Sequence, residues 1–164
     1  MRGWGIEFNE DIVPIGPLSN VPGKIAKYGS SVIFSHGSLT SSWNNTYSAE
    51  EVSIYNDFLW SGTENIVDSN LYDITSVIGN QYNNEEFFVG TWNNGLVKFE
   101  NNTISNIYNS ENSTLESISD EGWVRIGGLT YDSNGYLWMT NSQAQRPLVS
   151  FKNNSFERWE FNIT

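Results

Sequence analysis

Residues 97–104 read Val97-Lys98-Phe99-Glu100-Asn101-Asn102-Thr103-Ile104, with apolar residues at alternate positions around an Asn-Asn pair. Such alternation is typical of strands with one buried face, and a two-residue Asn/Asp turn between two of them predicts a β-hairpin. The pattern recurs at 52–59 (VSIYNDFL) and 149–156 (VSFKNNSF). A unit repeated at intervals of roughly 45–52 residues indicates a β-repeat array, in which each unit buries its face against its neighbours.

A further pair of strands precedes each hairpin. In the last unit, strands at 126–131 and 136–140 flank the turn 132–135. Four antiparallel strands per unit are typical of a β-propeller blade, so the chain is predicted to be an all-β propeller fragment of about three four-stranded blades. These blades are expected at residues 21–62, 71–112 and 123–162.

Residues 1–20 precede the first blade. The alternating stretch 4–8 is interpreted as the outer strand of a preceding blade, and the three prolines that follow suit an irregular crossover. Three blades cannot close a ring, because propellers use about four to eight. The sequence therefore predicts that the remaining blades come from the same, longer chain; the alternative is an obligate homo-oligomer. The first residues lack the apolar region of a signal peptide.

Composition excludes several classes of function. The chain has 8 Lys and Arg against 19 Asp and Glu, a net charge of −11. Neither nucleic acid nor an anionic membrane is expected as a partner, since phosphate contacts need clustered basic residues. Without cysteine there is neither a disulfide framework nor thiolate chemistry. No apolar run is long enough to span a membrane, and neither a metal nor another cofactor is expected.

One end of the blades is predicted to carry the function. The loops after the second strands, 36–49, 92–95 and 141–147, differ in length, and they share a face with the interblade connections 61–70 and 109–122. The opposite face has only tight Asn-rich turns. Long, variable loops on a rigid scaffold are where binding usually resides. The candidate ligand-binding residues on these loops are Trp43, Trp92, Asn93, Asn94, Asn141, Gln143 and Arg146.

Two chemistries are weighed for these candidates. An exposed Trp43 or Trp92 would stack on the apolar face of a sugar ring, but both could equally pack into the propeller wall. Arg146 is one of few cations available to an anionic glycan, together with Lys24, Lys27 and Arg125. At a net charge of −11 such a ligand requires a local basic pocket, and none is visible in the sequence.

Catalysis is not expected. His36 is the single histidine and is interpreted as a turn residue beside Gly37, which leaves no catalytic triad. The adjacent pairs Glu50-Glu51, Glu85-Glu86 and Asp120-Glu121 are interpreted as solvated edge or turn charge rather than a glycosidase pair. A propeller hydrolase or lyase stays the least favoured class.

Two further expectations concern the blades themselves. The stretch 132–135 (DSNG) resembles the start of a calcium loop but lacks its later ligands, so it is predicted to be a type I′ hairpin turn with positive φ at both central residues. The aromatic side chains at alternating strand positions are expected to pack between blades. These are Phe88, Phe99, Trp138 and Phe151.

Two segments, 90–99 (GTWNNGLVKF) and 132–141 (DSNGYLWMTN), resemble the two-component-regulator propeller repeat, which pairs a D-x-x-G-x-L-W strand with a G-T-x-x-x-G-L hairpin. The first unit departs from both halves of this pattern. The linker 108–115 (YNSENSTL) and the strand 125–129 (RIGGL) are also similar to the propeller of PorZ-like proteins of the type IX secretion machinery. The resemblance covers roughly residues 21–162.

The resemblance implies a module of the seven-bladed type in an extracytoplasmic location, the periplasm or surface of a Gram-negative bacterium. The preferred function is a non-catalytic binding or scaffold module in type IX secretion that attaches cargo to anionic surface polysaccharide or contacts other secretion-machinery proteins. The alternative is the periplasmic ligand-sensing propeller of a hybrid two-component sensor.

Overall fold

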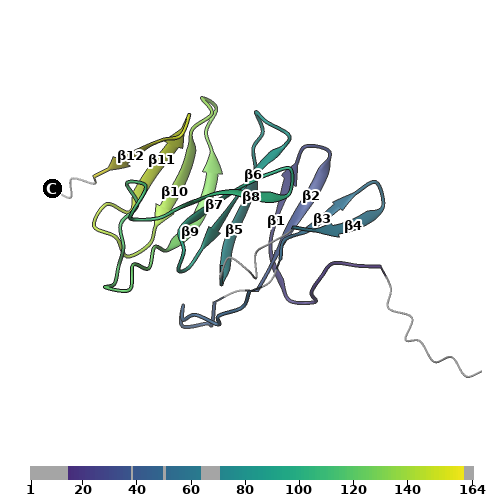
Figure 1. Ribbon diagram of the computed structural model, residues 1–164, viewed down its shortest axis with the longest axis horizontal. Coiled ribbons are helices and arrows are strands. Elements are labelled where there is room, and N and C mark those ends of the chain that lie inside the picture. Colours follow the sequence, from purple (N-terminus) through teal and green to yellow (C-terminus); the bar gives the residue numbers. More distant parts are fainter. Residues whose placement is uncertain (1–14, 38, 50, 64–70, 161–164) are drawn as a thin grey trace, which may run out of the picture.

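The computed structural model describes residues 15–37, 39–49, 51–63 and 71–160, and these contain three four-stranded antiparallel sheets and no helix (Figure 1). The first sheet consists of β1 (Pro22–Tyr28), β2 (Ser31–His36), β3 (Ser53–Asn56) and β4 (Leu59–Gly62). The second consists of β5 (Ile74–Gly79), β6 (Glu86–Thr91), β7 (Leu96–Glu100) and β8 (Thr103–Tyr108). The third consists of β9 (Ile126–Tyr131), β10 (Leu137–Asn141), β11 (Leu148–Lys152) and β12 (Ser155–Trp159).

Strands follow one another in chain order in every sheet, so each sheet is a simple meander. This confirms the all-β prediction and the three four-stranded blades of a propeller fragment. The strand expected at residues 4–8 lies outside the described residues.

The three repeated hairpins turn through left-handed residues. Asn101 and Asn102 have φ of 50° and 66°, and Asn153 and Asn154 have φ of 51° and 59°. This is the backbone that a type I′ turn requires and that Asn tolerates. In the first copy the turn is Asp57-Phe58, at 47° and 64°, so it lies one position later than the Asn-Asp pair. The register Asn56 to Leu59 fixes this shift, and Phe58 is 89% exposed.

The middle sheet is buried on both faces because neighbouring side chains of β6 point in opposite directions. Phe87 faces the first sheet, where it lies 5.0 Å from the Tyr28 ring, and it stacks on Phe99 at 4.6 Å. Phe88 faces the third sheet and meets Phe151 edge-on at 5.6 Å. Two separate apolar clusters therefore hold the three sheets in a row.

Phe88, Phe99 and Phe151 thus pack between sheets as expected. Leu137 and Met139, on either side of Trp138, join the cluster against the second sheet, so the alternation of β10 turns Trp138 to the other face of the third sheet. There it lies 5.5 Å from Trp159. Its packing against a blade therefore stays a prediction, which concerns a blade beyond the third sheet.

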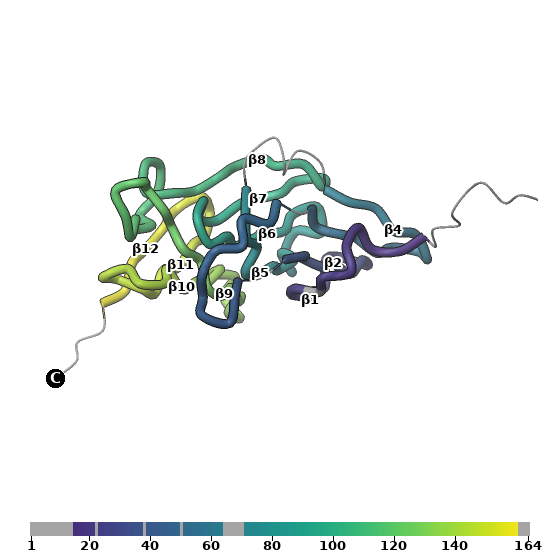
Figure 2. The backbone as a smooth tube through the Cα atoms, turned by 90° about the horizontal axis from the view of Figure 1, so that it is seen from below, coloured from purple at the N-terminus to yellow at the C-terminus, as the bar shows by residue number. Residues whose placement is uncertain are grey.

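The first strands of the three sheets lie side by side along one edge of the molecule (Figure 2). Gly79 sets how closely β5 approaches β1, because a Cβ there would be 2.1 Å from the carbonyl oxygen of Lys27 and 2.8 Å from the Tyr28 Cα. Such first strands line the central channel of a propeller. Backbone contact at this position thus fixes the wall of the channel.

Gly79→Ala is expected to lower the free energy of unfolding by about 1–3 kcal/mol, because the clash is with backbone atoms that cannot rotate away. Gly128→Ala in β9 is the matched control, since its Cβ would meet nothing nearer than the Thr140 Oγ1 at 3.8 Å. Denaturant unfolding of both variants measures the difference. Equal losses of stability would contradict the close approach of β1 and β5.

The turn at 132–135 differs from the type I′ prediction. Only Gly135 has positive φ, at 80°, and Asp132 closes the turn with its side chain instead. One carboxylate oxygen of Asp132 accepts hydrogen bonds from the backbone N–H groups of Asn134 and Tyr136, and the other accepts the indole N–H of Trp138 at 3.0 Å. An Asp that caps its own turn explains why Asp, Gly and Trp occur together in the D-x-x-G-x-L-W pattern.

The hydrogen bond from Trp138, followed by those from the backbone, lowers the pKa of Asp132 below its usual value. A carboxyl whose pKa is lower when folded stabilises the fold above its unfolded pKa of about 4, and this contribution is lost as the pH falls through the folded value. The stability difference between the wild type and Asp132→Asn is therefore expected to shrink below about pH 4. Denaturation midpoints at neutral and acidic pH test this, and a constant difference would contradict it.

His36 is not a turn residue. It ends β2, is buried, and its Nε2 lies 2.6 Å from the Ser53 Oγ on the neighbouring strand. The Ser53 hydroxyl also accepts the backbone N–H of Leu18 at 2.9 Å. Both side chains are buried. Their mutual contact and the hydrogen bond from Leu18 join β2, β3 and the segment that contains Leu18.

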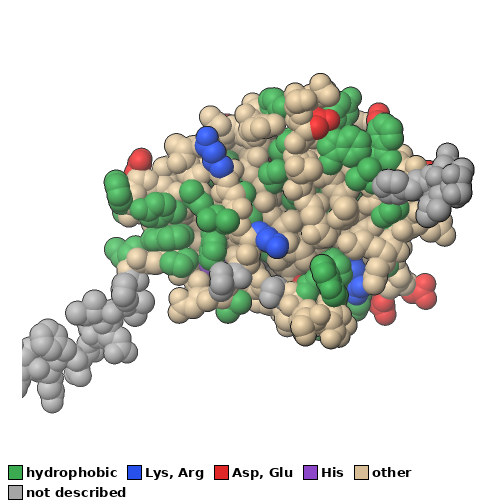
Figure 3. All heavy atoms as spheres, turned by 180° about the vertical axis from the view of Figure 1, so that it is seen from behind, with side chains coloured by type: hydrophobic (Ala, Val, Ile, Leu, Met, Phe, Trp, Pro, Cys, Tyr) green, Lys and Arg blue, Asp and Glu red, His purple; other side chains and the backbone are tan. Residues whose placement is uncertain are grey.

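The outer face of the first sheet is apolar and open. Ile25 is 70% exposed, and Val32 and Tyr55 lie beside it on the same face by register. Figure 3 shows hydrophobic side chains gathered at the end of the molecule that this sheet forms. Trp138 and Trp159 occupy the corresponding outer face of the third sheet. Both ends of the row therefore present apolar sheet faces.

Candidate functional site: the loop face

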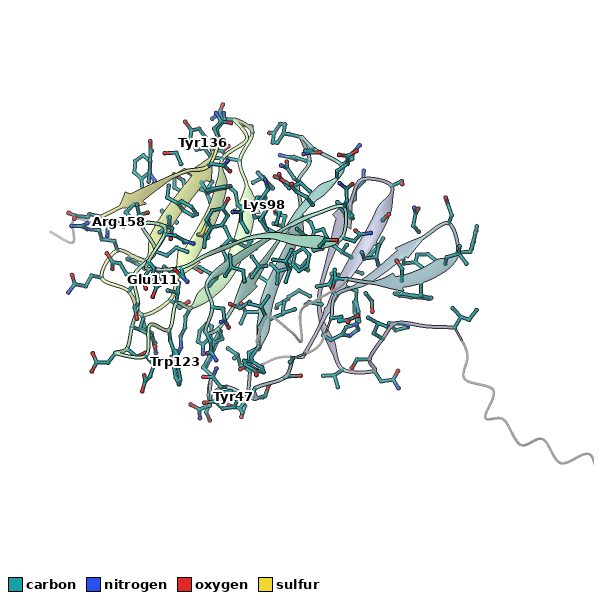
Figure 4. All side chains as sticks on the ribbon, viewed as in Figure 1. Tyr47, Lys98, Glu111, Trp123, Tyr136 and Arg158 are labelled. Atoms are coloured by element: carbon teal, nitrogen blue, oxygen red, sulfur yellow. The ribbon has the colours of Figure 1, made fainter. Side chains whose placement is uncertain are left out.

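The loops after the second strands converge at one end of the sheets, which we call the loop face. Figure 4 shows Tyr47 and Trp123 at this end and Tyr136 at the opposite, tight-turn end. Side chains link the loops to one another: the Asn45 Nδ2 donates to the Asn93 Oδ1 at 2.5 Å, and Arg125 donates to Gln143. The loops of all three sheets therefore form one surface.

Asp73 anchors the longest of these loops. It precedes β5 with φ of 54°, and its side chain is completely buried. The carboxylate accepts the side-chain N–H of Asn45 at 2.9 Å and the hydroxyl of Thr46 at 2.6 Å. It also accepts the backbone N–H groups of residues 46, 47 and 48 at 3.1–3.2 Å. A loop of the first sheet is thus held by a carboxylate of the second.

A stack of aromatic and cationic side chains crosses the loop face. The Trp43 ring lies 5.8 Å from Trp92, and the Arg125 guanidinium lies 5.0 Å from the Trp92 ring and 5.8 Å from that of Trp123. Trp43 is 66% exposed, whereas Trp92 is only 3% exposed. The two tryptophans therefore differ: Trp92 packs inside the protein, whereas one face of Trp43 is open to solvent. The expectation that Trp92 contacts a ligand was wrong because Arg125 and Trp43 cover it.

Three other candidate residues already bind neighbouring groups of the protein. Asn141 is fully buried, accepts the backbone N–H of Glu116 at 2.6 Å and donates to its carbonyl at 3.1 Å. It holds the interblade connection and has no surface for a ligand, which corrects the prediction. The Arg146 guanidinium pairs with Glu160 at 2.6 Å, so its charge is partly balanced. Gln143 is exposed, at φ of 67°, and accepts from Arg125.

The loop face has two hollows of about 440 Å³ each. The first, the Trp43 cleft, is lined by Trp43, Lys24, hydroxyl groups and the starts of β1, β5 and β9. Lys24 is its only charged residue among those described; the hydroxyl groups belong to Thr40, Ser41 and Thr75. The second contains Asn93 and Asn94 with Tyr47, Tyr72 and Trp123, and it carries Glu111 and Glu121.

The two hollows therefore differ in charge. The Trp43 cleft combines an aromatic face, a cation and hydroxyl groups beside the starts of β1, β5 and β9, a set of groups that can contact an acidic sugar. The second hollow is acidic and disfavours an anion. Asn93 and Asn94 line this acidic hollow rather than the Trp43 cleft, and their contact with a ligand stays a prediction.

Sequence reasoning missed the residues that organise this surface. Asp73 stands before a strand in an unremarkable context, and Trp123 lies in a linker, so neither has a local pattern. Lys24 was noted only as an available cation.

In the described part of the chain no three His, Cys, Asp or Glu side chains gather as potential metal ligands. Nor does any described helix have the length and apolarity to cross a membrane.

Three consecutive four-stranded meanders with their first strands side by side are the arrangement of β-propeller blades. No family model matches the sequence, and no curated protein matches it. Among solved structures the chain is similar to PorZ of Porphyromonas gingivalis, an essential bacterial surface component of the type-IX secretion system. The TM-score is 0.73 at 18% sequence identity, over 93% of this chain and 21% of PorZ. The two share a fold, and this chain spans about a fifth of the PorZ length.

Proposed function

We propose that the chain is a non-catalytic part of a surface propeller in type IX secretion, and that its loop face holds an acidic surface polysaccharide. The observation that carries the proposal is the Trp43 cleft, together with the fold similarity to PorZ, a bacterial surface component of that system. An extracytoplasmic location belongs to the same proposal. The secretion role is favoured over a sensor by the fold similarity to PorZ.

The chemistry of the cleft supports an acidic sugar. The exposed indole of Trp43 provides a flat apolar face for the C–H groups of a pyranose ring. Lys24 lies in the same cleft and provides a positive charge for a carboxylate, and no described carboxylate lines that cleft. The local charge is thus opposite to the net charge of −11. This single positive charge supports an anionic partner at the cleft.

The open apolar faces at the two ends of the row support the first part of the proposal, that the chain is part of a larger propeller. Ile25 and Val32 on the first sheet, and Trp138 and Trp159 on the third, are positioned as blade-to-blade contacts without a neighbouring blade. We expect further blades of the same polypeptide to cover them. A stable homo-oligomer of this chain at micromolar concentration in solution would instead indicate that further copies of the chain close the propeller ring.

Two variants test the cleft. Trp43 has φ of 60°, which glycine adopts without strain, so Trp43→Gly should preserve the fold while removing the stacking face. Lys24→Gln removes the charge. Both are expected to weaken retention on immobilised polygalacturonate by about tenfold, or about 1.4 kcal/mol.

The matched control is Lys27→Gln, which makes the same charge change in the same strand but lines a hollow at the tight-turn end. It should leave retention on polygalacturonate unchanged. Equal effects of Lys24→Gln and Lys27→Gln would show that retention depends on overall charge rather than on the cleft, and would overturn the assignment of the cleft as the binding site.

A further inference from the structure

A further cavity, of about 460 Å³ and separate from the two hollows of the loop face, lies at the opposite, tight-turn end. It is lined by both the second and the third sheets, and the buried rings of Phe88 and Phe151 are part of its lining. Its volume lies within the range of roughly 300–1,000 Å³ that is usual for ligand pockets. In Figure 4, Lys98 marks the second sheet and Tyr136 the tight-turn end of the third.

One wall carries a buried ion group. The Lys98 Nζ lies 2.7 Å from the Glu86 Oε2 and 2.6 Å from the Glu100 Oε1. The side chains of Lys98 and Glu86 are each 12% exposed, so Glu86 is not the solvated edge charge expected from the sequence. The Asn80 Nδ2 donates to the other Glu86 oxygen at 2.6 Å. These polar groups are held in place before any ligand arrives.

Burial acts to lower the pKa of Lys98, but the hydrogen bonds to Glu100 and Glu86 outweigh it and the pKa rises. Lys98 therefore remains charged at physiological pH. Lys152 is the second cation of the lining, with its Nζ 2.6 Å from the Asn134 carbonyl and 4.7 Å from the Tyr136 ring centroid. The lining thus has two cations and one carboxylate, Glu86, and the second carboxylate, Glu100, pairs with Lys98 from outside the lining.

The other wall offers uncommitted hydrogen-bonding groups. Tyr131 lies against Tyr82 at 6.0 Å, and burial raises the pKa of its phenol, which keeps its proton. Within the described part of the chain the Tyr131 hydroxyl has no hydrogen-bond partner. The Asn154 Oδ1 accepts the Tyr108 hydroxyl at 3.4 Å, which leaves its Nδ2 free to donate among the described residues. Asn134 and Asn153 add further side-chain amides to the lining.

We infer that this cavity binds a neutral, hydroxyl-rich ligand of the size of one sugar ring. Amide and phenol groups exchange hydrogen bonds with hydroxyls, and aromatic rings contact the apolar face of a pyranose. The balanced ion group disfavours a charged ligand, because an anion meets Glu86 and a cation meets Lys98 and Lys152. The site lies at the opposite end from the Trp43 cleft and differs from it in ligand charge.

The test is a titration of the isotope-labelled chain with methyl glycosides of glucose, galactose, mannose and N-acetylglucosamine, followed by NMR. At least one is expected to bind with about millimolar affinity and to shift the amides of Gly135 and Asn153 rather than those of Thr40 and Trp43. Galacturonate and glucosamine should bind at least fivefold more weakly at this site.

Tyr131→Phe removes only the hydroxyl and should weaken the binding at least fivefold, and Asn154→Gly, which suits the φ of 59° at this turn position, should do the same. Tyr55→Phe, on the outer face of the first sheet, makes the identical change away from the cavity and should have no effect. The inference is overturned if no neutral glycoside shifts the Gly135 and Asn153 amides at concentrations up to roughly 50 mM. It is also overturned if a charged sugar binds as tightly, or if Tyr131→Phe and Tyr55→Phe behave alike.

Discussion

Asp73→Asn is expected to lower the free energy of unfolding by about 2–4 kcal/mol. The buried carboxylate accepts five hydrogen bonds from residues 45–48, and an amide would turn one acceptor oxygen into a donor that faces other donors. Each buried donor left unpaired costs about 1–3 kcal/mol. Asn keeps the size of the side chain and tolerates the φ of 54°, so the loss reports on the hydrogen bonds and the charge of the carboxylate rather than on packing or backbone strain.

Asp57→Asn is the matched control for this substitution. Asp57 also has positive φ, at 47°, but it is exposed in a hairpin turn. Its substitution should change stability by no more than about 0.5 kcal/mol. Denaturant unfolding measures both, and hydrogen exchange at residues 46–48 should accelerate only in Asp73→Asn. Equal stability of the two variants would show that Asp73 does not anchor the loop.

Phe87→Ala is expected to cost about 3–5 kcal/mol, the usual range for truncating a buried phenylalanine. Phe87 has no exposed surface, stacks on Phe99 within its own sheet and meets Tyr28 of the first sheet. Its removal leaves a cavity where the first two sheets join, and relaxation is limited because β6 is buried on both faces.

Phe58→Ala makes the same truncation at a ring that is 89% exposed, and it should cost less than about 1 kcal/mol. Both variants are compared by denaturant unfolding. Similar losses would contradict the packing of the first and second sheets through Phe87.

The sequence predicted the blades well because their pattern is local. Alternation along β7 and β11 and the Asn pairs at 101–102 and 153–154 each specify a hairpin without reference to distant residues. The first hairpin was placed less accurately, since Phe58 occupies a left-handed turn position that its residue type gives no reason to expect.

The candidate site was predicted less well because burial depends on contacts between sheets. Asn141 and Trp92 were chosen for their place in loops, yet both are buried, Asn141 against the connection that contains Glu116 and Trp92 against Trp43 and Arg125. Asp73 and Lys24 gain their roles from residues more than ten positions away in the sequence. The packing of the sheets places the Asp73 carboxylate against residues 45–48, and it completes the cleft that Lys24 and Trp43 line.

The most direct measurement of the central proposal is a crystal structure of the chain soaked with trigalacturonate. We expect a sugar ring stacked on the exposed face of Trp43, with its carboxylate within ion-pair distance of the Lys24 Nζ. A sugar bound instead in the hollow of Glu111 and Glu121, or a Trp43 cleft left empty at saturating ligand, would contradict it.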